Sequence, residues 1–311
     1  MSAMAVAVVN YNTRAHLRAC LASAFEAGAA RVVVADNGST DGSIEMVAAD
    51  FPRAMLVVDA SNPGYGGAAN AAIACCDTDY VLLLNSDTVL RRGSLDALQA
   101  YLTAHPCAAI VGPRLVNADG TLQRSMHQFP TPLVTLLEYS WVGWAAGLVP
   151  TLRTVYVAAD SHARARVVPW VTGAALAIRK SAFDSVGGFD RSYFMYYEEV
   201  DLAYRLRRAG WETHFAPVTD VTHVGGASTG QQRGVMFAEQ MAAALRFSER
   251  HHSPGAARRT WWALQFSLWS RLASDTMRYH LTRDGVRRQR LAEDITTVRG
   301  ILRGPWRRSA R

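Results

Sequence analysis

The segment YVLLLNSD, residues 80–87, is an apolar run that ends in two polar residues and an acid. Similar apolar runs occupy residues 5–9, 31–35, 54–58 and 108–111. The segments between them have the spacing of amphipathic helices, at 14–27, 43–51, 67–76 and 94–105. Continuous apolar strands between amphipathic helices indicate a mostly parallel sheet covered by helices on both faces. The sequence therefore predicts an α/β fold.

Polar residues and glycines follow four of the predicted strands. They are Asn10-Tyr11-Asn12, Asp36-Asn37-Gly38, Asn62-Pro63-Gly64 and Asn85-Ser86-Asp87. In a sheet of this kind, ligands bind at the carboxyl ends of the strands. We therefore expect a ligand site along this edge of the sheet.

The composition is that of a globular protein with a sizeable core. Of the 311 residues, 50% are hydrophobic and 19% are charged, which excludes global disorder. The four cysteines form no CxxC pair and are too few for a disulfide scaffold. The chain enters the apolar run 5–9 without a basic leader, which favours a cytoplasmic protein over a secreted one.

The formal net charge is +7, and arginine predominates beyond residue 240. The basic residues of this part include Arg258, Arg259, Arg271, Arg278, Arg283, Arg287, Arg288, Arg290, Arg303, Arg307, Arg308 and Arg311. Such a tail binds phosphate, either on nucleic acid or on a membrane surface. We expect a domain at 1–233, with halves at about 1–115 and 116–233, and a basic, Trp-rich helical extension at 234–311.

The second half of the expected domain has a looser pattern. NADG at 117–120 predicts a turn between short strands. Residues 133–149 are apolar and rich in Trp, but the run is short for a membrane crossing and contains Glu138. We expect this segment to be partly buried or interfacial. A further strand is predicted at 172–179 and a further helix at 199–209.

The segment NPGYGGAAN, residues 62–70, is predicted to be a glycine-rich loop that opens a helix. Backbone N–H groups at a helix N-terminus bind phosphate. The segment is neither a Walker sequence nor GxGxxG, which weighs against ATP and NAD. A simple loop without a ligand is the alternative.

Single carboxylates follow two of the strands. Asp36 could accept hydrogen bonds from a base or a ribose, with a plain capping turn as the alternative. Asp87 could hold Mg²⁺ or Mn²⁺ together with substrate phosphates, because magnesium needs only one or two protein carboxylates when phosphates complete its shell. A turn aspartate is the alternative for Asp87.

Three carboxylates, Glu198, Glu199 and Asp201, come together at the start of a predicted helix. Acidic residues in a first turn are favoured by the helix dipole, which is the structural interpretation. A carboxylate crowded by others has a raised pKa and can act as a general base, which is the functional one. His223 is interpreted either as a metal ligand or as a buried polar residue.

Five segments, in this order and spacing, resemble the family 2 glycosyltransferases of GT-A fold. They are VVNYN (8–12), DNGSTDGS (36–43), NPGYGGAAN (62–70), LLLNSD (82–87) and TGAALAIRKSAFDSVGGFDRSYFMYYEEVDLAYRLRRAGW (172–211). Within that family the chain looks like the bacterial rhamnosyltransferases that build cell-wall linkers and O-antigens. The resemblance covers about residues 4 to 230 and implies a Rossmann-like sheet that binds a nucleotide sugar.

The resemblance also implies roles for single residues. Asp87 stands at the last position of the family's DxD metal motif, with Asn85 at its first, and His223 matches another metal ligand. The residues implied on the donor side are Asn10, Tyr11, Asn12, Asp36, Asn37, Gly38, Asn62, Gly64, Tyr65, Gly66, Asn70, Asn85 and Ser86. Those implied on the acceptor side are Trp170, Thr172 and Gly173.

The family's catalytic Glu-Asp pair falls on Glu198-Glu199, so the residue expected as the base is Glu199 where an Asp often stands. Asp201 is the second candidate for the base. The implied reaction is an inverting, metal-dependent transfer of a sugar, with L-rhamnose from dTDP-rhamnose as the best match. The implied acceptor is a hydroxyl of a polyprenyl-diphosphate-linked saccharide in cell-wall or surface polysaccharide synthesis, and the implied cofactor is Mg²⁺ or Mn²⁺.

Other functions remain as alternatives. One is a family 2 transferase that uses a donor such as a UDP-hexose on a soluble or polysaccharide acceptor; a nucleotidyltransferase is more remote. A two-carboxylate hydrolase would need neither the glycine-rich segment nor a metal. A nucleic-acid-binding protein would explain the charge but not the acidic edge of the sheet, so no nucleic-acid partner is expected.

The segment 260–272 has apolar residues at helical spacing, flanked by arginines. Its members are Trp261, Leu264, Leu268 and Leu272, with Trp262, Phe266 and Trp269 widening the apolar face. Trp beside Arg is typical of an interfacial helix. We therefore expect peripheral binding at the inner face of the cell membrane to an anionic surface, with an ordinary packed helix or a homodimer contact as the alternatives.

Overall fold

The computed structural model describes residues 4–140, 162–227 and 233–304. The chain forms two compact units. The sheet unit comprises Met1–Gln128 and Val157–Gln231, and the helical unit comprises Phe129–Tyr156 and Gln232–Arg311. Residues 129–140, which the sequence assigned to the acceptor half of a single domain, therefore group with the C-terminal helices.

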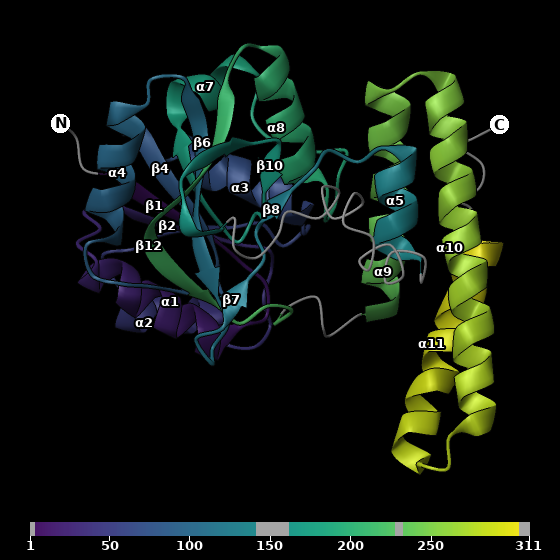
Figure 1. The fold of residues 1–311 in the computed structure, drawn as a ribbon. Coiled ribbons are helices and arrows are strands. Elements are labelled where there is room, and N and C mark those ends of the chain that lie inside the picture. The colour runs from purple at the N-terminus through teal and green to yellow at the C-terminus, as the bar shows by residue number, and fades with distance from the viewer. Residues whose placement is uncertain (1–3, 141–161, 228–232, 305–311) are drawn as a thin grey trace. The chain divides into compact units, whose positions relative to one another are not determined.

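The sheet unit, drawn as a ribbon in Figure 1, contains a ten-stranded sheet. Its strand order is β3-β2-β1-β4-β11-β6-β12-β5, with β7 paired to β6 and β9 paired to β12. The strands of the main path are β1 (Ala5–Asn10), β2 (Val32–Asp36), β3 (Met55–Val58), β4 (Tyr80–Asn85), β5 (Thr88–Leu90), β6 (Ala108–Val116), β11 (Ala175–Arg179) and β12 (Glu212–His223). The added strands are β7 (Leu122–Gln123) and β9 (Arg166–Val168). A separate two-stranded sheet pairs β8 (Met126–His127) with β10 (Trp170–Val171).

The first four strands run parallel, as the sequence predicts. β11 then lies antiparallel between β4 and β6, and β12 runs parallel to β6. The edge strand β5 pairs antiparallel with β12. The sequence pattern did not predict this short strand. The sheet is therefore mixed but mostly parallel.

Helices cover both faces of this sheet, because alternate residues of each strand point to opposite sides. Val6 and Val8 of β1 pack with Leu17 and Leu21 in one core, whereas Ala5 and Ala7 pack with α3 and α8 in the other. The helices of the sheet unit are α1 (Arg14–Glu26), α2 (Ser43–Asp50), α3 (Gly64–Ala74), α4 (Ser94–Ala104), α7 (Lys180–Ser185) and α8 (Glu198–Arg208).

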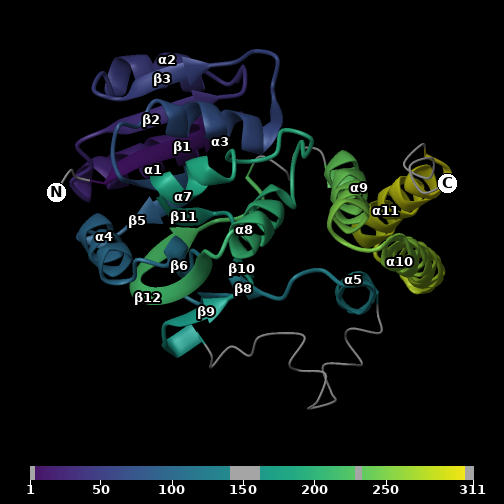
Figure 2. The ribbon, with the colours of Figure 1, turned by 90° about the horizontal axis from the view of Figure 1, so that it is seen from above.

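The helical unit contains α5 (Pro132–Tyr139), α9 (Arg233–His251), α10 (Pro254–Leu281) and α11 (Gly285–Arg303). α10 packs against the other three, and Figure 2 shows α9, α10 and α11 side by side. Ser253 caps α10 by accepting from the N–H of Ala256, and Asp284 caps α11 by accepting from Val286. Within the described ranges, no helix has both the length and the hydropathy that a membrane crossing requires.

The segment 133–149 is only partly described. Its first part lies in α5, and Leu137 is buried while Leu133 is exposed. Residues 141–149 lie outside the described residues. The turn expected at 117–120 is confirmed. The N–H of Asn117 donates to the carbonyl oxygen of Thr121 at 2.8 Å, which closes the turn between β6 and β7.

Candidate active site

Polar side chains meet at the carboxyl ends of β1, β2 and β4. Asn10 Nδ2 donates to Asp36 Oδ2 at 2.7 Å, and Asn10 Oδ1 accepts from the Thr13 hydroxyl, also at 2.7 Å. The Thr13 hydroxyl in turn lies 2.7 Å from Ser86 Oγ. These four residues are buried, and Tyr11 beside them is half-buried. The parallel strands therefore assemble a polar cluster from residues far apart in the sequence.

The turn after β2 is fixed against the end of β1. Ser39 donates from its N–H to Asp36 Oδ1 at 2.7 Å and from its hydroxyl to Asp36 Oδ2 at 2.8 Å. The same hydroxyl accepts from the N–H of Asn12 at 2.8 Å. Gly38 has a φ of +77°, and a Cβ there would lie 3.0 Å from the Cα of Ala60. Ser39, part of the quoted motif 36–43, and Thr13, which the sequence analysis did not single out, thus belong to the cluster.

Two amide oxygens at this edge have no hydrogen-bond partner among the described residues. They are Oδ1 of Asn37 and Oδ1 of Asn85, and both atoms are fully covered. The Asn37 side chain is held in place through Nδ2, which donates to the carbonyl of Gly64 at 3.2 Å. A buried acceptor without a donor costs about 1–3 kcal/mol. Each of these oxygens therefore has an unused capacity to accept a hydrogen bond.

The glycine-rich segment is the first turn of α3, not a loop. The helix begins at Gly64, whose φ is +79°, and a Cβ there would collide with the carbonyl oxygen of Phe194. The N–H of Tyr65 donates to that same oxygen at 2.9 Å. A Cβ at Gly66 would lie 3.1 Å from the Cβ of Phe189. The glycines therefore permit close packing of α3 against the segment ahead of α8, and the Tyr65 N–H is not available to a phosphate.

Two asparagines expected on the donor side bind backbone instead. Asn70 donates from Nδ2 to the carbonyl of Phe189 at 2.8 Å and accepts from the N–H of Phe189 at 2.9 Å. Asn62, which has a φ of 50°, accepts from the N–H of Gly64 at 3.4 Å. Asn70 thus links α3 to the segment that leads into α8.

Asp87 and His223 lie side by side although they are far apart in the sequence. His223 Nε2 lies 3.4 Å from Asp87 Oδ1, and the N–H of Gly225 donates to Asp87 Oδ2 at 3.0 Å. His223 Nδ1 lies 2.7 Å from Oε1 of Gln123 on β7. The imidazole therefore lies between Gln123 on its Nδ1 side and Asp87 on its Nε2 side. The sequence did not indicate a role for Gln123, because only the pairing of β7 with β6 places it beside His223.

The carboxyl of Asp87 is kept ionised. Burial raises its pKa, but the neighbouring His223 and backbone N–H groups outweigh burial, so the net pKa is lowered. No group of three or more His, Cys, Asp or Glu side chains with metal-ligand geometry occurs within residues 4–140, 162–227 and 233–304. Asp87 and His223 could therefore supply two ligands, a carboxylate and an imidazole, to a cation whose other ligands come from elsewhere.

Glu199, in the first turn of α8, lies against Gly173. The two residues are in close contact, because a Cβ at Gly173 would lie 3.5 Å from Glu199 Oε1. The Oε2 atom is fully covered and has no hydrogen-bond partner within the described part of the chain. Burial raises the pKa of Glu199, and the N–H groups only partly offset it. A carboxylate with a raised pKa is a better proton acceptor than an exposed one.

The other two carboxylates have different environments. Asp201 is fully buried, and its Oδ2 accepts from Arg205 Nε at 2.6 Å. Arg205 also donates to the carbonyls of Val186 and Gly188, each at 2.7 Å. Asp201 therefore holds the arginine that fastens the loop ahead of α8. Glu198 is buried beside Glu199.

The residues expected on the acceptor side form a second cluster. The Trp170 ring stacks on His127 with centroids 4.1 Å apart, and Trp170 Nε1 donates to the carbonyl of Gln128 at 2.8 Å. His127 Nε2 lies 3.0 Å from Thr172 Oγ1, next to Gly173. Burial lowers the pKa of His127 to about 4, with a smaller contribution from His162. His127, which the sequence analysis did not identify, joins this cluster because β8 pairs with β10.

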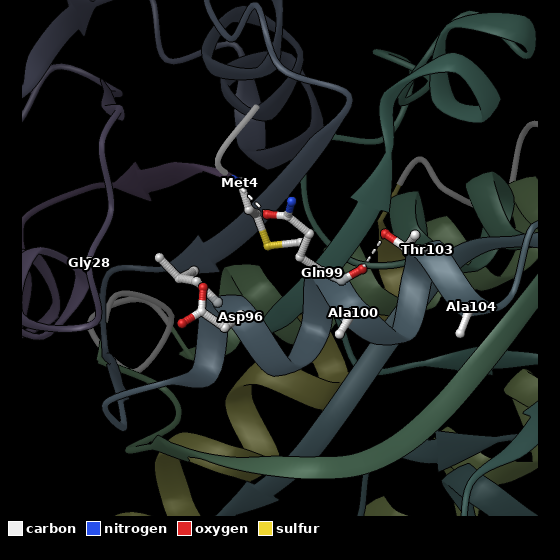
Figure 3. Close-up of a pocket in the computed structure, with 8 residues that line it drawn as sticks. Met4, Gly28, Asp96, Gln99, Ala100, Thr103 and Ala104 are labelled. Atoms are coloured by element: carbon white, nitrogen blue, oxygen red, sulfur yellow. Dashed lines mark hydrogen bonds between the residues drawn. The ribbon is translucent and has the colours of Figure 1, made fainter. Parts of the chain in front are cut away.

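A pocket in the sheet unit lies away from these residues. It has a volume of about 560 Å³ and is lined mainly by α4, including Asp96, Gln99 and Thr103 (Figure 3). Met4, which also lines it, precedes β1, so this pocket is at the amino end of the strand. The polar cluster of Asn10 is at the carboxyl end. The pocket is therefore separate from the candidate active site.

This combination of a mostly parallel sheet and a polar and acidic carboxyl edge is that of a nucleotide-sugar-dependent transferase of the GT-A class. Residues 5–187 match the model of glycosyl transferase family 2. The chain belongs to this family and is a glycosyltransferase.

Relatives with known names support the same class. The chain is 33% identical to an N-acetylglucosaminyl-diphospho-decaprenol L-rhamnosyltransferase of Mycobacterium tuberculosis, over 92% of this chain and 94% of that protein. It is 29% identical to the rhamnosyltransferase WbbL of Escherichia coli, over 51% and 60% of the two chains. A mannosyltransferase of Pyrobaculum calidifontis, crystallised with GDP-Man and Mn²⁺, has the same fold, with a TM-score of 0.55 at 17% identity over 99% and 82% of the chains.

Proposed function

We propose that this enzyme transfers L-rhamnose from dTDP-rhamnose to a hydroxyl of a polyprenyl-diphosphate-linked saccharide, with inversion at the anomeric carbon. The observation that carries this proposal is the 33% identity to the mycobacterial rhamnosyltransferase, which extends over nearly the whole of both chains. The printed name of that relative specifies N-acetylglucosaminyl-diphospho-decaprenol as the acceptor. We expect an acceptor of the same chemistry here.

Glu199 is the proposed general base. Its covered carboxyl with a raised pKa can take the proton of an acceptor hydroxyl, whose oxygen then bonds to the anomeric carbon as the bond to the diphosphate breaks. The leaving diphosphate departs on the side opposite the attack, so the configuration inverts. Asp201 is less suited to this role, because its carboxylate already pairs with Arg205.

Asp87 and His223 are proposed to hold Mg²⁺ or Mn²⁺. Asp87 Oδ1 and His223 Nε2 lie close enough to bind one cation, and Gln123 orients the imidazole through Nδ1. Protein residues supply few ligands here, so donor phosphates would complete the shell. When bound, the cation neutralises charge that develops on the departing diphosphate.

The donor nucleotide is proposed to lie along the carboxyl edge of β1, β2 and β4. The Oδ1 atoms of Asn37 and Asn85, which lack a donor among the described residues, are the proposed acceptors for it, and Ser39 fixes the Asp36 turn beside them. The acceptor approaches from the cluster of Trp170, His127 and Thr172, which adjoins Glu199 through Gly173.

A donor panel tests the proposal. The enzyme is incubated with Mn²⁺ and dTDP-rhamnose, UDP-glucose, UDP-N-acetylglucosamine or GDP-mannose, with and without polyprenyl-diphosphate-N-acetylglucosamine. We expect acceptor-dependent release of dTDP and a product whose new linkage has the configuration opposite to the donor. Turnover of a UDP-hexose in place of dTDP-rhamnose would overturn the donor assignment.

We also propose that the helical unit rests on an anionic membrane surface. α10 has two apolar faces: Leu264 and Leu268 are buried, whereas Trp262, Phe266 and Trp269 are exposed. Leu264 and Leu268, expected from the sequence on the lipid side, are therefore part of the packed face. An exposed apolar stripe beside a packed apolar face marks an interaction surface.

The positive charge of the extension favours an anionic lipid surface as the partner of this exposed stripe. Residues 254–304 carry ten arginines against four carboxylates, and the one carboxylate of α10, Asp275, is buried beside Arg271. Exposed Met277 and Leu281 continue the stripe of Trp262, Phe266 and Trp269. Each basic residue near an anionic surface contributes about 1 kcal/mol, whereas two such basic faces repel each other.

A further inference from the structure

The turn between α10 and α11 carries a hollow lined by arginines. α10 ends at Leu281 and α11 begins at Gly285, and Figure 1 shows the two helices joined by this short turn. The hollow has a volume of about 390 Å³. Its basic members are Arg278 from α10 and Arg287 and Arg290 from α11. Two helices therefore contribute three arginines to one hollow.

The side chains of these arginines are not engaged elsewhere. Arg278, Arg287 and Arg290 are exposed, and none of them makes a side-chain hydrogen bond or an ion pair with another residue of the ranges that the structure describes. The neighbouring Arg288, in contrast, lies over the Tyr279 ring, 4.7 Å from its centroid. A guanidinium without a protein partner keeps all five N–H donors for an anion.

Two carboxylates also line the hollow, and one of them already has partners. Asp284 Oδ1 accepts from the N–H of Val286 at 2.9 Å and from the N–H of Arg287 at 3.3 Å. The other carboxylate is Asp294. Three arginines outnumber these two acids, and Arg283 in the turn adds a fourth positive charge. Because Asp284 occupies N–H groups at the start of α11, the arginine side chains are the groups that can bind an anion here.

Exposed apolar side chains stand on both sides of the same turn. Leu281 is 73% exposed and Val286 is 79% exposed, which is more than any of Trp262, Phe266 and Trp269. Val286 also lines the hollow. Exposed apolar side chains beside basic ones are typical of a segment that enters the headgroup region of a bilayer. A free phosphate ion makes no use of them, whereas a phospholipid presents phosphate and apolar groups together.

We propose that the hollow at the α10–α11 turn binds the phosphate of an anionic phospholipid. Arg278, Arg287 and Arg290 are the ligands of the phosphate, and Leu281 and Val286 lie against the apolar part of the lipid. Arginine suits this role because its planar guanidinium can donate two parallel hydrogen bonds to phosphate oxygens. The inference rests on the proposed contact of the helical unit with an anionic membrane, and it names the chemical group that this contact recognises.

The test compares two double variants of the full chain that lose the same charge from the same helix. Arg287→Gln with Arg290→Gln, the hollow variant, removes two ligands. Arg299→Gln with Arg303→Gln is the matched control, because both residues are exposed and lie about 18 Å further along the α11 axis. Flotation with vesicles of phosphatidylglycerol and phosphatidylcholine measures binding. We expect the apparent dissociation constant to rise about 10- to 30-fold in the hollow variant and less than about threefold in the control.

Two outcomes of this comparison would overturn the proposal. Equal weakening in both double variants would show a general attraction between the basic extension and the surface, without a site. Wild-type binding by the hollow variant would show that the hollow takes no part. Arg278→Gln, which removes the ligand on the other helix, should also weaken binding and decides the matter if thermal melting finds the hollow variant unfolded.

Two further measurements identify the source of the phosphate. Titration calorimetry with inorganic pyrophosphate should find a dissociation constant no lower than about 1 mM, because exposed ion pairs are weak without apolar contact. Submillimolar binding that the hollow variant loses would make a free phosphate the ligand and overturn the lipid assignment. Val286→Ser should weaken vesicle binding several-fold, whereas Val235→Ser, at a residue of α9 that is 60% exposed, should not. Equal effects of these two variants would overturn the lipid assignment as well.

The outcome is separable from that of the proposed function. Failure of the wild type to bind anionic vesicles would overturn the membrane contact and this inference together. Normal wild-type binding that the hollow variant retains would overturn this inference alone. Sugar transfer is not the readout, so a wrong donor or acceptor assignment does not affect the result.

Discussion

His223 Nε2 lies 3.4 Å from Asp87 Oδ1, and the antiparallel pairing of β12 with β5 fixes this distance. In that pairing His223 is opposite Thr88, the residue that follows Asp87. A one-residue slip would turn the imidazole to the other face of the sheet. The edge strand β5 therefore determines whether the two side chains can share one ligand.

The first prediction concerns this pair. Asp87→Ala should lower turnover by about 10²-fold or more, because the departing diphosphate would lose its charge neutralisation. Turnover should also require Mg²⁺ or Mn²⁺ and return when the metal is restored after chelation. Initial rates of nucleoside diphosphate release, measured over a metal titration, check both points.

Gln123→Ala should have a milder effect than Asp87→Ala. It should weaken the apparent metal affinity by about 10- to 100-fold while saturating metal restores much of the rate. Asp119→Asn, on an exposed turn, is the control. Full activity in excess EDTA would remove Asp87 and His223 from a metal role.

The second prediction concerns the base. Glu199→Gln should retain donor binding but lower kcat by roughly 10²- to 10⁴-fold, the usual contribution of a positioned general base. Glu199→Asp should retain part of the activity, because it keeps a carboxylate. Single-turnover rates together with nucleotide binding separate chemistry from affinity.

Asp201→Asn provides the contrast. It breaks a buried pair with Arg205, so its main effect should be a lower melting temperature. A folded but inactive Asp201→Asn together with an active Glu199→Gln would transfer the base assignment to Asp201.

The third prediction is a pH dependence. Burial raises the folded-state pKa of Glu199 above 4.5, and the protonated form cannot accept a proton. kcat should therefore fall as the pH is lowered through this raised pKa, at a pH above 4.5. The pKa of Asp87 is lowered, so loss of metal should occur at more acidic pH. Metal-saturated profiles distinguish the two groups.

The fourth prediction concerns stability. The pKa of His127 is lowered from 6.5 to about 4 by burial, so between these values the unfolded chain binds the proton that the folded chain excludes. The free energy of unfolding should therefore fall by about 1–3 kcal/mol as the pH is lowered from 6.5 to 4. Urea unfolding at a series of pH values measures this change.

His127→Gln should flatten that part of the profile, because glutamine does not titrate and can still reach Thr172. Below pH 4 the wild type and the variant should show parallel slopes. An equally steep profile in the variant would assign the acid sensitivity to other groups.

The fifth prediction concerns the exposed stripe of α10. Replacing Trp262, Phe266 and Trp269 by Ser should weaken binding to anionic vesicles by about 10- to 100-fold, because apolar area would no longer be removed from water. Wild-type binding should weaken as salt rises, through screening. Flotation with vesicles of phosphatidylglycerol and phosphatidylcholine measures both effects.

The matched control replaces three exposed valines of the sheet unit, Val58, Val89 and Val167, by Ser. It should bind vesicles like the wild type. Equal binding to neutral and anionic vesicles, with a tight dimer in sedimentation, would show instead that a second copy covers the stripe.

The sequence by itself determined the frame of the sheet unit. The apolar strands β1, β2 and β4 and the helices between them follow from hydrophobic periodicity, which depends only on near neighbours in the chain. The motifs also indicated the family, and the polar residues that end the strands marked the ligand edge. Asp36, Asp87 and Glu199 were all identified in this way.

Only the tertiary structure decided how these residues are used. Periodicity carries no information about β5, β7 or β8, which are too short, yet these strands bring in His223, Gln123 and His127. The close approach of α3 to Phe194 turned an expected phosphate loop into a packed helix start. On α10, spacing revealed apolar residues but not which of them face other helices. Each of these outcomes depends on contacts between distant segments, which local sequence patterns do not encode.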